Sequence, residues 1–106
     1  MIGVIYRLHL KPGTEHAYKT CWRLVADYFV AQCGALGSRL HQDKDGWFVI
    51  YSNWPDDATR QAAWPGDDAP NEILPNNIRK AIFDMKDYVL EKDDEVVLNV
   101  VEDKLQ

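Results

Sequence analysis

The feature that most constrains the fold is a strict two-residue alternation from Ile2 to Leu10. Side chains point to opposite faces of an extended chain at successive positions, so this segment has one apolar and one mixed face. The apolar face consists of Ile2, Val4, Tyr6, Leu8 and Leu10, and the mixed face carries Gly3, Ile5, Arg7 and His9. The alternation predicts a half-buried strand with a core on one side and a second surface on the other.

A helical repeat follows this strand. Lys11-Pro12-Gly13 ends the strand, and Thr14 is placed to cap a helix with its side chain. Apolar residues then recur at steps of three and four, which is the spacing of the buried stripe of a helix: Tyr18, Cys21, Trp22, Val25 and Phe29. The pattern predicts a long helix that stops before Gly34.

The middle of the chain predicts a hairpin. Residues Gly34 to Gln42 form one expected strand, and Trp47 to Trp54 form another that is rich in aromatic and β-branched side chains. Asp43-Lys44-Asp45-Gly46 supplies the turn between them. The two segments are therefore expected to pair as neighbouring antiparallel strands.

The remaining segments complete the order of elements. Asp56 is expected to cap a short helix that reaches Trp64, and Pro65 to Pro70 is expected to be a flexible loop. Glu95 to Val101 predicts a last strand after the turn residues Asp93-Asp94. Between the loop and this strand, helical spacing resumes from Pro75 with the stripe Ile78, Ala81, Ile82, Met85 and Val89.

This order is the split βαβ pattern of a ferredoxin-like α+β fold: a four-stranded antiparallel sheet with helices on one face. A chain of 106 residues makes one domain, 1–106. The mixed face of the first strand is repeated on the last by Val97, Asn99 and Val101. Such a face is commonly covered by a second copy of the chain, so we expect a homodimer packed sheet against sheet.

Charge and composition disfavour several classes of partner. The formal net charge is -5, and no basic cluster is longer than Arg79-Lys80, so no nucleic-acid partner is expected. Apolar runs fall short of the roughly 20 residues of a membrane span. With no secretory signal pattern, and with only Cys21 and Cys33, the expected location is the cytoplasm.

The common catalytic motifs are not present in the sequence. His9, His16 and His41 lack metal-ligand spacing, so no metal site is expected. The paired carboxylates fall at predicted turns or helix caps. There we expect them to be solvated residues of helix starts and loops and not an acid–base pair. No serine elbow, glycine-rich phosphate loop or nucleotide fingerprint occurs, so hydrolase and nucleotide chemistry are not indicated.

Several segments together resemble one family. They are the first-strand segment Val4 to Glu15 with its Lys-Pro-Gly ending, the Gly34-Ala35-Leu36-Gly37-Ser38 entry to the second strand, and Val49 to Pro55 followed by Trp64. Over nearly its whole length the chain resembles the antibiotic biosynthesis monooxygenase (ABM) domain. The resemblance implies a dimeric α+β barrel with a pocket between the helix-facing side of the sheet and the helices.

The resemblance leaves more than one chemistry open. Some members oxidise polycyclic aromatic or quinol substrates with molecular oxygen and no metal or flavin, others degrade haem, and others have no assigned reaction. Of the haem-degrading pattern only Trp64 is matched: Tyr6 occupies the place of the expected Asn, and Asn71 to Glu91 contains no histidine to ligate haem. A cofactor-independent oxidation of a small aromatic or quinol compound is the leading hypothesis.

Such an oxygenase needs a dry aromatic pocket, a group that orients or deprotonates a phenol, and a cation that steadies the developing anion. The candidate catalytic residues are Tyr6, Trp64 and Arg79. The candidate substrate-binding residues are Trp22, Tyr51, Asn53 and Met85. Tyr6 and Trp22 have a second interpretation as ordinary core residues.

A different class of function also fits the sequence. No base is recognisable beside the aromatic residues, which favours a non-enzymatic dimeric barrel that binds a small apolar ligand or acts as an accessory or stress protein. An open pocket of about 300 Å³ or more would support a ligand site, whereas a closed one would leave function to the outer surface.

Overall fold

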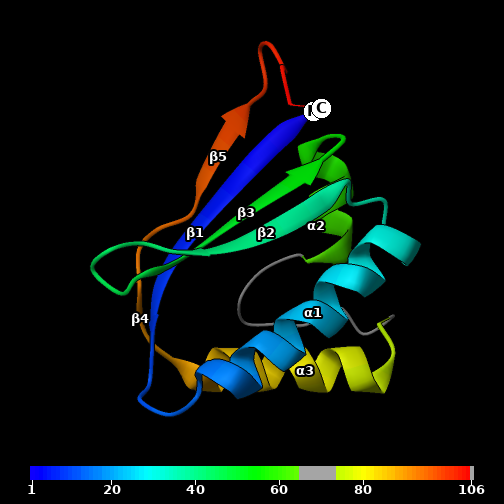
Figure 1. Ribbon diagram of the computed structural model, residues 1–106. Coiled ribbons are helices and arrows are strands. Elements are labelled where there is room, and N and C mark those ends of the chain that lie inside the picture. Colours follow the sequence, from blue (N-terminus) through cyan, green and yellow to red (C-terminus); the bar gives the residue numbers. More distant parts are fainter. Residues whose placement is uncertain (65–73, 106) are drawn as a thin grey trace.

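The computed structural model describes residues 1–64 and 74–105, and it has the α+β architecture expected from the sequence. Helices α1 and α3 lie side by side against one face of an antiparallel sheet, and the other face is open (Figure 1). The elements are β1 (Ile2–Leu10), α1 (Glu15–Gln32), β2 (Gly37–Gln42), β3 (Phe48–Trp54), α2 (Asp57–Ala63), α3 (Asn76–Tyr88), β4 (Val89–Lys92) and β5 (Val96–Asn99).

The sheet has the ferredoxin-like order β2-β3-β1-β4, with β5 also paired to β1. Over the described residues it contains five strands and not the four predicted, because the edge beside β1 is formed by two short strands. β4 pairs antiparallel with Leu8–Leu10 and β5 with Ile2–Ile5. Val89, which was predicted on the helical stripe, begins β4 because α3 ends at Tyr88. The chain leaves the sheet edge between the two strands, at residues 93–95.

The core lies between the sheet and the helices. The predicted apolar face of β1 is confirmed, with Ile2, Val4 and Leu8 buried. The α3 stripe is buried at Ile78, Ala81, Ile82 and Met85, and that of α1 at Tyr18, Val25 and Phe29. Burying these stripes against one sheet face provides the hydrophobic stabilisation of the domain.

On the last strand, the residues that face outward are shifted by one position from those predicted. Val96 pairs with Ile5 and Leu98 with Gly3, so these two β5 side chains, 48% and 43% exposed, lie on the outer face. A two-residue period does not by itself say which phase faces the core when both phases are apolar. Of the residues predicted on this face, Val97 and Asn99 instead lie on the helix side of the sheet. Val101 lies beyond the end of the strand.

The two predicted helix caps have different outcomes. Asp56 caps α2 as expected, since its Oδ1 accepts a hydrogen bond of 2.7 Å from the backbone N–H of Thr59, which also lowers the pKa of the Asp56 carboxyl. Thr14 precedes α1 but does not cap it, because its hydroxyl donates to the carbonyl of Lys11 at 2.7 Å. The loop predicted at Pro65 to Pro70 lies outside the described residues.

Two further observations concern the described residues. Among them, no helix is long and apolar enough to cross a membrane. Cys21 and Cys33 are both free thiols and half-buried. Burial raises the pKa of each thiol, which favours its protonated, unreactive form.

The packing of α3 makes a direct prediction about stability. Ile82 is 1% exposed in the core, whereas its neighbour Phe83 is 68% exposed. Replacing Ile82 by Ala should lower the free energy of unfolding by about 2–5 kcal/mol, because it removes buried methyl groups and leaves a cavity. Phe83→Ala should change it by about 0.5 kcal/mol or less. Urea unfolding measures both, and equal losses would contradict this assignment of the core.

Candidate functional site

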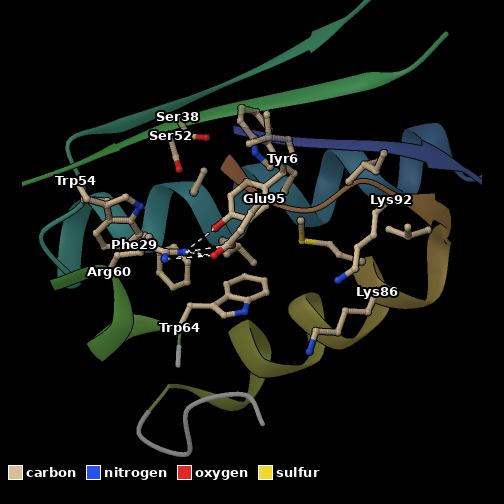
Figure 2. Close-up of a pocket in the computed structure, with 18 of the residues that line it drawn as sticks. Tyr6, Phe29, Ser38, Ser52, Trp54, Arg60, Trp64, Lys86, Lys92 and Glu95 are labelled. Atoms are coloured by element: carbon tan, nitrogen blue, oxygen red, sulfur yellow. Dashed lines mark hydrogen bonds and ion pairs between the residues drawn. The ribbon is translucent and has the colours of Figure 1, made fainter. Parts of the chain in front are cut away.

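A pocket of about 440 Å³ lies between the helix side of the sheet and the helices. It exceeds the size that a ligand site requires, and most of its lining is apolar (Figure 2). All three helices and the residues 93–95 contribute to its wall. The aromatic members of the lining are Tyr6, Tyr18, Trp22, Phe29, Trp54 and Trp64.

Three of these rings form a continuous surface. The ring of Phe29 lies 5.7 Å from that of Trp54 and 6.1 Å from that of Trp64, both in tilted or edge-on contact. Such contacts add to area burial and hold the rings in place. The wall therefore presents a preorganised aromatic surface against which a flat ring can pack.

Arg60 is the central polar residue of this wall. Its side chain is 7% exposed, and it donates hydrogen bonds to Asp57 Oδ1 at 2.9 Å, to Glu95 Oε2 at 3.3 Å and to the Tyr6 hydroxyl at 3.4 Å (Figure 2). A buried guanidinium needs such partners, since removing it from water without them is costly. The contacts bring α2, β1 and the β4–β5 connection together at one point.

The balance of these contacts keeps Arg60 charged. Burial alone lowers the pKa of the guanidinium, but the hydrogen bonds to Asp57, Tyr6 and Glu95 outweigh it and the net pKa is raised. The site thus holds a permanent cation directly beside a phenol and a carboxylate. Such a group can stabilise an anion that forms within hydrogen-bond reach.

Other polar groups lie at the two sides of the pocket. Ser38 and Ser52 are paired across β2 and β3 and contribute hydroxyls to the lining. Lys86 of α3 and Lys92 of β4 contribute amino groups on the side of the pocket opposite Trp54 (Figure 2). The pocket is therefore apolar in its middle and polar at both sides.

The structure brings four of the seven sequence-predicted residues together. Tyr6, Trp22, Trp64 and Met85 all line the pocket. Arg79 does not line it, although it lies on α3 beside the buried stripe. Successive helix residues are about 100° apart, so Arg79 points away from the direction taken by Ile78. Arg60 occupies the place of the expected cation.

Tyr51 and Asn53 lie on the other side of the sheet. They pair with Ile5 and Gly3, and the Asn53 side-chain amide donates to the Tyr51 hydroxyl at 3.1 Å. The tyrosine ring covers Gly3, where an added Cβ would come within 2.8 Å of it. Trp54, the alternating neighbour of Asn53, faces the pocket instead. The two residues thus belong to the outer face.

The sequence contained a signal for Arg60 that is visible in retrospect. Ala63 and Trp64 follow Arg60 by three and four residues, which is the spacing of one helix face, so an arginine shares the buried face of a short helix with a tryptophan. An arginine at such a position needs a carboxylate partner. Asp57 is close in sequence, but Glu95 is 35 residues away and only the fold brings it to Arg60.

The histidines do not form part of this site. His9 and His41 lie on the outer face: the His9 ring is 3.6 Å from that of Trp47, and His41 Nδ1 lies 3.1 Å from the carbonyl of Val49. Over the described part of the chain, no group of three or more His, Cys, Asp or Glu side chains is arranged to hold a metal ion.

Comparisons by sequence and by structure give different results. No protein-family model matches the chain, and no curated protein matches it significantly. Solved structures do match. An antibiotic biosynthesis monooxygenase superposes with a TM-score of 0.71 at 17% identity, covering 96% of this chain and 100% of that one.

Two further structures match over similar lengths. A candidate antibiotic biosynthesis monooxygenase of Chloroflexus aurantiacus gives a TM-score of 0.74 at 18% identity and covers 99% of this chain and 98% of its own. SnoaB, a cofactor-independent oxygenase of Streptomyces nogalater, superposes with a TM-score of 0.73 at 10% identity and covers 99% of this chain and 97% of its own. Over nearly its whole length, this chain has the fold of antibiotic biosynthesis monooxygenase structures.

Proposed function

We propose that this protein is a cofactor-independent monooxygenase that oxidises a small aromatic or quinol compound in the pocket. The observation that carries the proposal is the Arg60, Tyr6 and Glu95 cluster set into a wall of aromatic rings. The likeness in fold to SnoaB, a cofactor-independent oxygenase, supports it. A fold alone does not determine a reaction, so the proposal depends on the groups in the pocket.

In the proposed reaction the substrate itself supplies the electrons. A phenol or quinol that loses a proton becomes an electron-rich anion, which can reduce molecular oxygen. The ring carbon beside the deprotonated oxygen forms a bond to O₂, and its C–H becomes C–OH as the quinol is oxidised to a hydroxyquinone. One oxygen atom of O₂ enters the product as this hydroxyl, and the other leaves as water with the two hydrogens that the quinol loses. The protein has to bind the ring, take the first proton and stabilise the anion.

The described residues provide a group for each of these tasks. Trp64, Phe29 and Trp54 hold the flat ring. Glu95 accepts the proton, because its carboxylate lies in the pocket wall and is 44% exposed, which leaves it accessible to a ligand. Arg60 and the Tyr6 hydroxyl, 3.4 Å apart, stabilise the substrate oxyanion. Arg60 replaces Arg79 in this role.

A second function is favoured by one feature of the same cluster. Both carboxylate oxygens of Glu95, the proposed base, already accept hydrogen bonds from Arg60. A pocket with an engaged carboxylate can also serve a protein that only binds a small apolar ligand. Turnover separates the two functions, whereas binding does not.

We also propose that the protein is a homodimer through the outer face of its sheet. The exposed side chains of Val96 and Leu98 adjoin Ile5 and Tyr51 on that face. An apolar sheet face in contact with water is unfavourable, and a second copy with the same patch would cover it. The dimer would leave the pocket, on the opposite side of the sheet, accessible.

The enzyme proposal predicts the effect of a subtle change at the base. Glu95→Gln keeps the shape of the side chain but removes its capacity to accept a proton, so oxygen uptake with a naphthohydroquinone should fall by about 10²–10⁴-fold in kcat. Arg79→Met removes a cation that lies outside the pocket, and it should leave the rate unchanged. An oxygen electrode measures both rates against the buffer reaction. Tryptophan quenching by the quinol without enzymatic oxygen uptake in the wild type would favour the binding function instead.

The dimer proposal predicts a change in mass in solution. The wild type should sediment as a dimer at micromolar concentration, and Leu98→Asp should shift it toward the monomer, because a charge would be buried in the interface. Phe83→Asp introduces the same charge at an exposed site on α3 and should leave the dimer intact. A monomeric wild type in sedimentation equilibrium would refute the proposal.

A further inference from the structure

The hydroxyl of Tyr18 is a buried polar group that the proposed oxidation does not use. Tyr18 begins the apolar stripe of α1 and is 2% exposed, and it belongs to the lining of the pocket. Over the described part of the chain, this hydroxyl takes part in no hydrogen bond. A buried tyrosine usually finds a partner for its O–H, so its absence here requires an explanation.

The oxygen of this hydroxyl opens onto the pocket. Among the described residues, no fully enclosed side-chain oxygen or nitrogen lacks a hydrogen-bond partner, so the Tyr18 oxygen is not fully enclosed. Because almost none of the residue is in contact with bulk solvent, the space that the oxygen reaches is the cavity that Tyr18 lines. The hydroxyl is therefore available to a ligand in that cavity.

Burial determines which kind of group this hydroxyl can bind. Desolvation raises the pKa of the Tyr18 phenol, and no charged group acts on it in the opposite direction. At neutral pH the phenol is therefore an uncharged O–H donor with one hydrogen to give. Such a donor matches an uncharged acceptor, such as the oxygen of a carbonyl, an ether or a second hydroxyl.

Tyr18 lies away from the Arg60 cluster along α1. Phe29, which ends the same stripe, lies with Arg60 at one side of the pocket (Figure 2). Tyr18 comes about three helical turns before Phe29. The guanidinium of Arg60 reaches Tyr6 and Glu95, which lie between it and the far side of the pocket (Figure 2). A ring held at this cluster therefore extends toward Tyr18.

We propose that Tyr18 is a specificity-determining residue, which donates a hydrogen bond to an uncharged oxygen on the side of the substrate away from Arg60. The substrate then carries two oxygens on opposite sides of its ring. One oxygen loses its proton to Glu95, and the other is held by Tyr18. A 1,4-quinol meets this requirement, whereas a phenol with a single oxygen does not. This inference rests on the proposed function of the pocket, and it adds the residue that orients the ring.

The test compares two probes of nearly equal shape, 4-methoxy-1-naphthol and 4-ethyl-1-naphthol. The first has an ether oxygen, an uncharged acceptor, where the second has a CH₂ group. Binding is followed in the absence of oxygen, so that no turnover occurs, by quenching of tryptophan emission, since three of the four tryptophans line the pocket. Tyr18→Phe should weaken binding of the methoxy probe by about five- to tenfold and leave that of the ethyl probe unchanged, because one uncharged hydrogen bond is lost.

Tyr28→Phe is the matched control. Tyr28 lies on the same helix and is half-buried, but it does not line the pocket, so the loss of its hydroxyl should affect neither probe. Urea unfolding tests whether the Tyr18 hydroxyl has a structural role. Tyr18→Phe should not lower the free energy of unfolding, because this hydroxyl has no hydrogen bond to lose within the described protein.

Two results would overturn the inference, and they are distinguishable. If both probes quench the wild type and Tyr18→Phe alters their affinities by the same factor, or alters neither, Tyr18 does not bind the second oxygen. The aromatic pocket would then still bind its ligand, and the proposed function would stand. An absence of quenching by either probe in the wild type would refute the role of Tyr18 and the proposed function together.

Discussion

The buried guanidinium of Arg60 is the interaction on which the site depends. It joins α2, the Tyr6 position of β1 and the connection between β4 and β5, three parts of the chain that are far apart in sequence. The Arg60 side chain is 7% exposed, whereas those of Asp57 and Glu95 are 52% and 44% exposed. A guanidinium removed from water depends on such partners for its hydrogen bonds. The same contacts that satisfy Arg60 therefore keep the wall of the pocket in one arrangement.

The division of the edge strand into β4 and β5 follows from the same point. An uninterrupted strand would pair along the whole of β1, whereas here the chain leaves the sheet at residues 93–95 and these residues line the pocket. Glu95 reaches Arg60 from this connection, and Asp93 reaches Arg7. Two ion pairs thus hold the connection, and the resulting irregularity places a carboxylate in the pocket wall.

The two faces of the sheet have separate functions in this arrangement. The helix side contains the core and the pocket, with the aromatic rings of Phe29, Trp54 and Trp64 in contact. The outer side carries a different set of contacts, in which Arg7 lies 4.0 Å from the ring of Trp47 and Tyr51 covers Gly3. Two-residue alternation makes this division possible, because neighbouring residues of one strand serve opposite surfaces.

Much of the fold was predictable from periodicity alone. The alternation of β1 and the stripes of α1 and α3 correctly indicated the buried faces, because burial along an element follows its geometric period. Tyr6, Trp22 and Met85, which line the pocket, lie on these periodic faces, whereas Trp64 was predicted from the family resemblance. Short elements were harder: β5 was predicted with the wrong phase, because its apolar residues occur at both phases of the alternation.

Only the tertiary structure decided which polar residues meet. The sequence analysis named Arg79 as the cation, but packing turns Arg79 away from the pocket and buries Arg60 beside Tyr6. Asn53 and Trp54 likewise compete for the pocket, and strand register assigns it to Trp54. Local patterns determine which face of an element is apolar, whereas contacts such as Arg60 with Glu95 form between segments whose approach no local pattern encodes.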